Sequence, residues 1–251
     1  MARIAETIDA VILCGGQGLR LRPVIGDCPN SLAPIHGTAF LHILLHFLSG
    51  YGIERFIFCS GHRGDAIEDQ FANLSDARTY VFSREDQPLG TAGALKNAET
   101  YVKSDPFLVL NGASLCPADL GAFAATHKSK KAVASIVATQ ADANLDRASI
   151  EVDSDNRVIG FANTTSAIRR LSSAGIYLFD RSVLDRIPVG RHASLEDEVL
   201  PALVGSNFYA YLTDALLIDI ATPERYGEAQ GLLRSRVERL CAMNGSIYGR
   251  K

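Results

Sequence analysis

The sequence predicts an α/β fold with a mixed, mostly parallel central sheet flanked by helices. In the first half, short apolar runs alternate regularly with segments of helical periodicity, whereas strand-like segments dominate the second half. Regular strand–helix alternation favours parallel strands joined by right-handed crossovers. We therefore expect one domain over residues 1–251, with a first half to about residue 130 and a more strand-rich second half from about residue 131 to 251.

The first half contains apolar runs of strand length, each bounded by turn residues or charges. They are Asp9–Leu13, Arg55–Cys59, Thr79–Phe82 and Phe107–Leu110. Segments of helical character separate these runs. They are Phe40–Leu48, Gly64–Phe71, Gly90–Tyr101 and Pro117–His127.

The second half begins with strand-like segments separated by turn chemistry. The predicted strands are Val133–Thr139, Ser149–Val152, Val158–Phe161, Ser173–Phe179, Phe208–Leu212 and Leu216–Ile220. A helix is predicted over Leu195–Val204. A terminal helix is predicted from Pro223 to about Cys241, with Thr222 as its N-cap.

Composition excludes several classes of protein. The net charge of −3 shows no bias toward nucleic acid, and the basic run His127–Lys131 is expected to be a solvated helix end. No run approaches the roughly 20 apolar residues of a membrane span, and Met1–Ile8 does not resemble a signal peptide. Five scattered cysteines without a CxxC pair indicate reduced thiols, so a cytoplasmic location is expected; Cys14 is interpreted as a small apolar residue.

A glycine-rich loop follows the first predicted strand. From Leu13 the chain reads LCGGQGLRLRP, in which Gly15, Gly16 and Gly18 permit close approach of the backbone to a ligand. Free N–H groups in such a turn favour phosphate oxygens, and the guanidinium of Arg20 suits phosphate geometry. Neither the P-loop pattern nor the dinucleotide fingerprint fits this loop, because the required Gly-Lys-Ser/Thr and third helix-opening glycine are absent.

With its later motifs, the chain resembles the sugar-1-phosphate nucleotidylyltransferases, whose first strand ends in GGxG-Thr/Ser-Arg-Leu-x-Pro. The later matching blocks are Pro88–Leu95 (PLGTAGAL), Asn111–Gly112, Ala174–Phe179 (AGIYLF), Ser194–Glu196 and Ile218–Tyr226 (IDIATPERY). The resemblance covers nearly the whole chain and is closest to the guanylyltransferase branch acting on mannose- or heptose-1-phosphate. It implies a Rossmann-like nucleotide-diphospho-sugar transferase fold.

The resemblance also implies a reaction and its site. A sugar 1-phosphate oxygen attacks the α-phosphorus of a nucleoside triphosphate, GTP being favoured, and pyrophosphate leaves. The first half is expected to bind the nucleotide through Leu13, Gly15, Gly16, Gly18, Gln87, Gly90 and Thr91. The second half, with the end of the fourth strand, is expected to bind the sugar phosphate through Asn111, Gly112, Gly175 and Glu196. Arg20 and Asp219 are the expected catalytic residues, and Asp219 is the expected ligand of Mg²⁺.

Several family positions are substituted. Asn30 replaces a phosphate-binding lysine, and Ala113 replaces a metal-binding aspartate. Asn163 and Thr164 stand where a Glu-Lys pair is expected. Losing one preorganised electrostatic contact typically costs about 10²–10³ in rate. Compensating cations would have to come from other residues. The candidates are Arg22, Arg63, Arg84 and Lys96.

Three hypotheses therefore remain. The first is an active nucleotidylyltransferase with an atypical site, whose turnover depends on a divalent metal and on Asp219. The second is an inactive paralogue that binds a nucleotide or nucleotide sugar and regulates or scaffolds a partner; a homo-oligomer or an active paralogue is the expected partner. The third, a glycosyltransferase, is weaker because no Asp-x-Asp motif follows Leu110.

Overall fold

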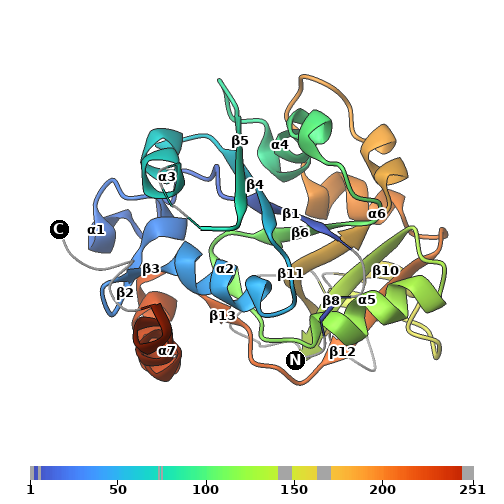
Figure 1. Cartoon of the computed structure of the whole chain (residues 1–251). Helices are drawn as coiled ribbons and strands as arrows, with labels where there is room; N and C mark the ends of the chain where they lie inside the picture. Colours follow the sequence, from blue (N-terminus) through green and yellow to red (C-terminus); the bar gives the residue numbers. More distant parts are fainter. Residues whose placement is uncertain are drawn as a thin grey trace.

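The computed structural model describes residues 3–4, 7–72, 74, 76–140, 149–162 and 171–244. Its central feature is a nine-stranded sheet, in which one path runs β10-β9-β11-β6-β1-β4-β5 and β8 pairs with both β11 and β12 (Figure 1). The strands of this sheet are β1 (Asp9–Leu13), β4 (Arg55–Ser60), β5 (Thr79–Arg84), β6 (Phe107–Asn111), β8 (Ala134–Gln140), β9 (Ser149–Val152), β10 (Val158–Ala162), β11 (Leu171–Phe179) and β12 (Phe208–Thr213).

Two small ribbons and the helices complete the described fold. One ribbon pairs β2 (Pro34–Ile35) with β3 (Thr38–Ala39), and the other pairs β7 (Ser114–Leu115) with β13 (Ile218–Asp219). The α-helices are α1 (Arg22–Ile25), α2 (Phe40–Ser49), α3 (Gly64–Phe71), α4 (Gly90–Asn97), α5 (Leu120–Ser129), α6 (Leu200–Ala202) and α7 (Pro223–Asn244).

The predicted parallel arrangement of the first half is confirmed. β1 pairs in parallel with both β4 and β6, and β4 pairs in parallel with β5. β11 joins β6 antiparallel, which makes the sheet mixed, and β12 runs parallel to β8. Because parallel strands end at the same edge of a sheet, the loops after β1, β4, β5 and β6 gather there.

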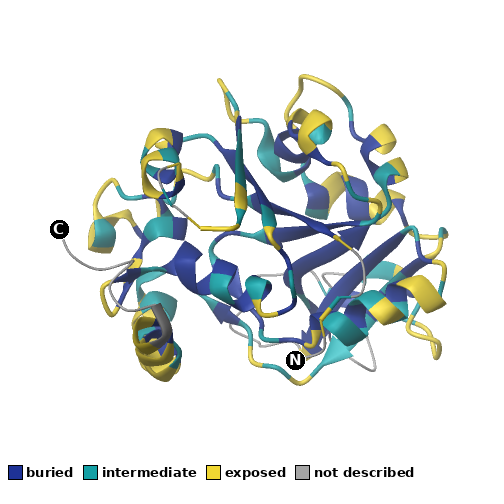
Figure 2. Ribbon diagram, in the orientation of Figure 1, coloured by how far each residue is buried: buried dark blue, intermediate teal, exposed yellow. Residues whose placement is uncertain are grey.

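Helices cover both faces of the sheet, because successive side chains of each strand point to opposite faces. On β1, Ala10 and Ile12 join a cluster with residues of α2, α3, α5 and α7, whereas Val11 joins a cluster with α4 and α6. Figure 1 shows α4 and α6 on one side of the sheet and α2 and α5 on the other. Figure 2 shows the strands buried between them.

Some predicted boundaries were wrong for local reasons. The predicted helix over Gly90–Tyr101 ends at Asn97 and continues as a 3₁₀ turn, Glu99–Tyr101, because the carbonyls of both Ala94 and Leu95 accept from Ala98 N. The helix predicted from Pro117 begins at Leu120, because the Asp119 carboxylate caps it by accepting from the N–H groups of residues 121 and 122.

The second half shows similar differences. The predicted helix Leu195–Val204 divides into a π-helical turn, Leu195–Val199, and α6, since Val199 N donates to Ser194 O five residues back. The predicted strand Leu216–Ile220 is reduced to β13. The terminal helix begins at Pro223 as predicted, and Thr222 Oγ1 accepts from Arg225 N at 3.4 Å.

In the basic run His127–Lys131, residues 128, 129 and 131 are exposed as expected, but His127 is buried. The ring is 4% exposed and lies within hydrogen-bonding distance of Ser135 Oγ (2.9 Å) and Asp180 Oδ1 (3.2 Å). The five cysteines are free thiols. Cys14 is buried, and burial raises the pKa of its thiol, which agrees with its interpretation as a small apolar residue. Among the described helices, none is long and apolar enough to cross a membrane.

Candidate functional site

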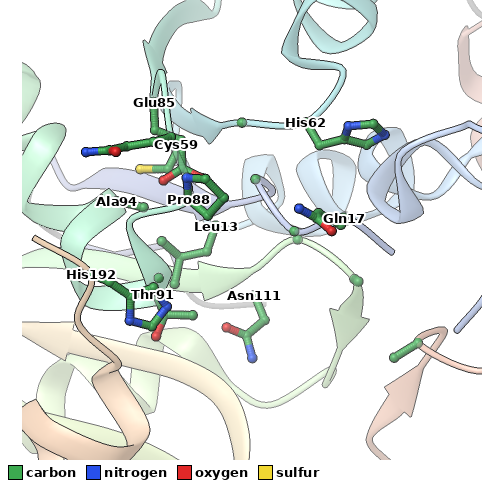
Figure 3. Close-up of a pocket in the computed structure, with 18 of the residues that line it drawn as sticks. Leu13, Gln17, Cys59, His62, Glu85, Pro88, Thr91, Ala94, Asn111 and His192 are labelled. Carbon is green, nitrogen blue, oxygen red and sulfur yellow. The ribbon is translucent and has the colours of Figure 1, made fainter. Parts of the chain in front are cut away.

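A cavity of about 690 Å³ opens at the edge where the parallel strands end. This volume lies within the range typical of small-molecule sites. Its walls come from the segments after β1, β4, β5 and β6, the start of α4, the segment before the π-helical turn and the end of β13. Figure 3 shows several of these side chains around the space between the loops.

The structure brings most of the predicted site residues to this cavity. Those that line it are Leu13, Gly15, Gly16, Arg20, Gln87, Gly90, Thr91, Asn111, Gly112 and Asp219, together with the substituted position Ala113. Gly18, Asn30, Gly175 and Glu196 lie outside the lining. Asn163 and Thr164 lie outside the described residues.

Asn30 packs against the glycine-rich loop at Gly18. Gly18 has φ +62°, a conformation that favours glycine, and the Asn30 side chain lies against it. Asn30 Oδ1 is buried with no hydrogen-bond partner among the described residues. Position 30 therefore contributes packing against the loop rather than a positive charge in the cavity.

The wall after β5 carries carboxylates. Glu85, Asp86 and Gln87 line the cavity, and Figure 3 labels Glu85 near Pro88 and Cys59. Glu85 is half-buried, and its Oε2 accepts a 3.2 Å hydrogen bond from Leu89 N. Burial raises the pKa of Glu85, an effect that the bond from Leu89 opposes. The result is an oriented acceptor in a partly desolvated wall.

Thr91 connects the two halves of the site. Its hydroxyl donates to Glu196 Oε2 at 2.9 Å and accepts from Leu195 N at 2.8 Å. The Tyr177 hydroxyl donates to Glu196 Oε1 at 3.4 Å, so both carboxylate oxygens are held. Glu196 thus lies behind Thr91, outside the cavity lining, and Thr91 orients its carboxylate.

The end of β6 forms another wall of the cavity. Asn111 and Gly112 line the cavity, and the Asn111 amide lies beside the backbone of Gly175, which explains why position 175 is near the site without lining it. Ala113 follows, and its carbonyl accepts a 3.1 Å hydrogen bond from Ile220 N. Ala113, in the turn before β7, and Asp219, at the end of β13, are therefore close together at one corner of the cavity.

Asp219 is engaged within the protein. Its side chain is 8% exposed, its Oδ1 accepts from Ala221 N at 2.8 Å, and Arg225 Nη1 lies 3.4 Å from the same oxygen. No cluster of three metal-ligating side chains occurs in the described part of the chain. With Ala113 beside it and Arg225 paired to it, Asp219 does not fit as the single protein ligand of a Mg²⁺ held without substrate, because Mg²⁺ is usually bound through one or two carboxylates together with substrate phosphates.

The candidate compensating cations do not reach the cavity. Arg22 and Arg63 both pair with Asp27, the latter at 3.0 Å. Arg84 pairs with Glu68 at 2.6 Å, and Lys96 pairs with Glu99 at 2.8 Å. Arg20 is the one arginine or lysine among the described lining residues. The histidines His62 and His192 are the other basic groups there.

Several lining residues were not predicted. They are Gln17, Cys59, Gly61, His62, Glu85, Asp86, Ser114 and His192. Pro88, Ala94 and Ala221 lie within the matching blocks Pro88–Leu95 and Ile218–Tyr226 but were not named as site residues. Glu85 directly follows a predicted strand, a position that could have identified it, since parallel strands carry ligand-binding groups at their carboxyl ends. Nothing in the sequence pattern distinguishes His192, which lies on an irregular segment.

The nucleotidyl transferase family model matches residues 9–235, which includes every described lining residue. The chain belongs to this family. The similarity extends to curated sugar-1-phosphate guanylyltransferases, which confirms the resemblance to the sugar-1-phosphate nucleotidylyltransferases and the mixed α/β fold that it implies.

Individual relatives cover most of the chain. A mannose-1-phosphate guanylyltransferase of Mycobacterium tuberculosis is 33% identical over 87% of this chain, which spans 62% of that enzyme's length. A D-glycero-alpha-D-manno-heptose 1-phosphate guanylyltransferase of Aneurinibacillus thermoaerophilus is 30% identical, with 89% of this chain and 97% of the relative covered. The crystal structure of HddC from Yersinia pseudotuberculosis, complexed with GMP-PN, has a TM-score of 0.78 and 30% identity, covering 90% of this chain and 100% of that one.

Proposed function

We propose that this protein binds GTP and a hexose- or heptose-1-phosphate. It transfers GMP slowly from GTP to the sugar phosphate. The observation that carries the proposal is the meeting, in one cavity, of the glycine-rich loop, Thr91 and the end of β13 at Asp219, with Glu196 bonded to Thr91 from behind the lining. The names of the relatives support guanosine and these sugars.

In the proposed reaction, an oxygen of the sugar 1-phosphate attacks the α-phosphorus of GTP. A new P–O bond forms, the bond to the β-phosphate breaks, and pyrophosphate leaves with the electron pair. Because such transfers need little covalent help, the protein contributes positioning and charge neutralisation. Backbone N–H groups at Gly15 and Gly16 and the guanidinium of Arg20 are the groups suited to hold phosphate oxygens. Mg²⁺ enters as the counter-ion of the triphosphate.

Glu85 supports the choice of guanine. Guanine presents two adjacent donors, N1–H and N2–H₂, on its Watson–Crick edge, whereas adenine, cytosine and uracil do not present this pair. A carboxylate accepts such a pair, and Glu85 Oε2 is already oriented by the N–H of Leu89. Hydrogen bonds from the guanine donors would offset the desolvation of the Glu85 carboxylate, which raises its pKa.

The missing charges imply slow turnover. Two lost electrostatic contacts, at Asn30 and Ala113, would together raise the barrier by about 6–8 kcal/mol. A rate constant near 10 s⁻¹ would then fall to the order of 10⁻³ s⁻¹ or lower. We place the reaction in the cytoplasm, where GTP and sugar phosphates are available.

A second candidate function is binding without turnover, which Ala113 and the Asp219–Arg225 pair favour. In that case the chain would regulate or scaffold a partner, such as an active paralogue or a second copy, in response to a nucleotide sugar. The two candidates share the same binding site and differ only in catalysis.

Pyrophosphate release separates them. The unmodified chain and an Asn30→Lys, Ala113→Asp double variant are each incubated with Mg²⁺, a nucleoside triphosphate and mannose- or heptose-1-phosphate. Slow release by the unmodified chain with GTP, reduced by Arg20→Ala, supports the transferase. Release by the double variant alone supports binding without turnover, and a preference for another triphosphate contradicts the guanosine assignment. If neither protein releases pyrophosphate or binds GDP-mannose in calorimetry, both candidates are rejected.

A further inference from the structure

The corner of the cavity at β7 and β13 has a distinctive charge arrangement. Antiparallel pairing sets Asp219 opposite Ser114, and the hydrogen bond from Ile220 N to Ala113 O fixes the neighbouring residue. Ala113 and Asp219 both line the cavity. The methyl group of Ala113 offers no ligand to a cation, so Asp219 is the only carboxylate at this corner among the described lining residues.

Arg225 reaches this carboxylate from outside the cavity. It lies in the first turn of α7, where Thr222 Oγ1 accepts from its backbone N–H. Its Nη1 is 3.4 Å from Asp219 Oδ1, and the two side chains are 21% and 8% exposed. Low exposure strengthens the interaction of opposite charges, because water screens them less. The guanidinium of Arg225 therefore offsets the charge of Asp219 at this corner.

We propose that Arg225 takes the charge-neutralising part that a protein-held divalent cation would otherwise have, so that the cavity binds the diphosphate of a nucleotide sugar without a resident metal. The proposal rests on the proposed function only for the identity of the ligand. Its basis is charge: two carboxylates and a divalent cation sum to zero, and so do one carboxylate and one guanidinium. A divalent cation would add two positive charges to the Asp219–Arg225 pair, whose own charges already sum to zero.

A metal-binding measurement tests the proposal without any nucleotide. Mn²⁺ is titrated into the full chain, and the electron paramagnetic resonance signal of free Mn²⁺ is followed. We expect no stoichiometric binding by the unmodified chain below about 1 mM. An Ala113→Asp, Arg225→Gln variant, which adds a second carboxylate and removes the Arg225 guanidinium, should bind one Mn²⁺ per chain at least tenfold more tightly. Circular dichroism spectra and thermal unfolding confirm that each variant is folded.

Two results would overturn the proposal. One is stoichiometric Mn²⁺ binding by the unmodified chain that Asp219→Asn removes. The other is a folded Ala113→Asp, Arg225→Gln variant that binds Mn²⁺ no more tightly than the unmodified chain, since Arg225 would then not be what occupies the carboxylate.

Nucleotide-sugar binding supplies the second test. Calorimetry with GDP-mannose is performed in Mg²⁺ and in EDTA. The unmodified chain should bind equally, within about twofold, under both conditions. Arg225→Gln leaves the Asp219 charge facing the diphosphate and should weaken binding in EDTA about tenfold; Arg225→Lys should restore it. Arg234→Gln, at an exposed position on the same helix, is the matched control and should bind like the unmodified chain.

The outcomes distinguish this proposal from the proposed function. If GDP-mannose does not bind to any form of the protein, the ligand assignment fails, and the Mn²⁺ titration still decides whether Arg225 replaces a metal. If GDP-mannose binds to the unmodified chain only in Mg²⁺, the function stands and the proposal about Arg225 is rejected.

Discussion

Thr91 Oγ1 and Glu196 Oε2 are 2.9 Å apart, although their residues are 105 positions apart in the chain. The hydroxyl also accepts from Leu195 N at 2.8 Å. One side chain therefore orders both the backbone and the carboxylate of the segment before α6, residues 191–196. Around it, Ala92 N donates to Ala193 O and Ala193 N donates to Leu89 O. The start of α4 and this segment therefore form one rigid unit along the cavity wall.

Thr91→Val tests this unit. Valine retains the shape but cannot donate to Glu196 or accept from Leu195, and each lost hydrogen bond in a half-buried site costs about 1 kcal/mol or more. We expect the free energy of unfolding to fall by about 1–3 kcal/mol and GDP-mannose affinity to fall about tenfold, measured by urea denaturation and calorimetry. Thr91→Ser keeps the hydroxyl and should remain close to the unmodified protein. A loss in Thr91→Ser with none in Thr91→Val would show that the methyl group, not the hydroxyl, matters.

Gly93 permits the close approach of α4 to the segment before α6. A Cβ at this position would be 2.8 Å from Arg191 O and 2.9 Å from Leu89 Cβ. Because the first contact is with backbone, Gly93→Ala should force the two segments apart and lower the free energy of unfolding by about 1–3 kcal/mol. Thermal or urea unfolding measures this change.

Gly227→Ala is the matched control for Gly93→Ala. Gly227 is also helical, in α7, but a Cβ there would have no neighbour within 4 Å. Alanine has the higher helix propensity, so this change should stabilise the protein by about 0.5–1 kcal/mol. A stabilising effect at Gly93 as well would contradict the close contact between the segments.

Glu85→Gln should weaken guanosine binding selectively. The amide replaces one acceptor with a donor, which conflicts with the N1–H and N2–H₂ groups of guanine. Hydrogen bonds to a charged group contribute about 1.5–3 kcal/mol, so GDP affinity should fall about 10- to 100-fold. Calorimetry compares GDP with UDP for Glu85→Gln and for the control Asp86→Asn, whose exposed side chain also lines the cavity. An equal loss for both nucleotides would remove Glu85 from base selection.

The sequence predicted the parallel part of the fold because local patterns determine it. The predicted strand Asp9–Leu13 has the same bounds in the structure, and after Asp9 it is apolar throughout, since a strand covered on both faces needs no polar alternation. The glycine-rich loop lies at the cavity because the chain after a parallel strand leaves from one edge of the sheet, whereas Thr91 was predicted from the family resemblance of Pro88–Leu95.

Contacts between distant residues could not be predicted in this way. The pairing of Arg225 with Asp219 depends on how α7 leaves β13, and the burial of His127 depends on Ser135 and Asp180 packing around it. Helical spacing gives the same signal for a buried and an exposed histidine. Likewise, the pairing of Arg63 with Asp27, which removes that cation from the site, joins residues 36 positions apart.

His42 should make stability depend on pH. Its ring is 4% exposed, and it packs edge-on against Phe71 with ring centroids 4.6 Å apart. Burial, assisted by the positive charge of Arg78 and opposed by Asp76, lowers the pKa of His42 to about 4, whereas an unfolded histidine titrates near 6.5. Between these values the unfolded chain binds a proton that the folded chain does not, so stability is complete above pH 6.5 and declines as the pH falls toward 4.

The expected loss from His42 across this interval is about 3 kcal/mol, from a pKa difference of about 2.5 units. Urea denaturation between pH 7 and about 4.5 measures it, and His42→Phe, which keeps an aromatic ring against Phe71, should flatten the curve. Some slope should remain, because burial also lowers the pKa of His46 and His127. The nuclear magnetic resonance titration of the His42 ring gives an independent value; a midpoint near 6.5 in the folded protein would contradict the buried neutral ring.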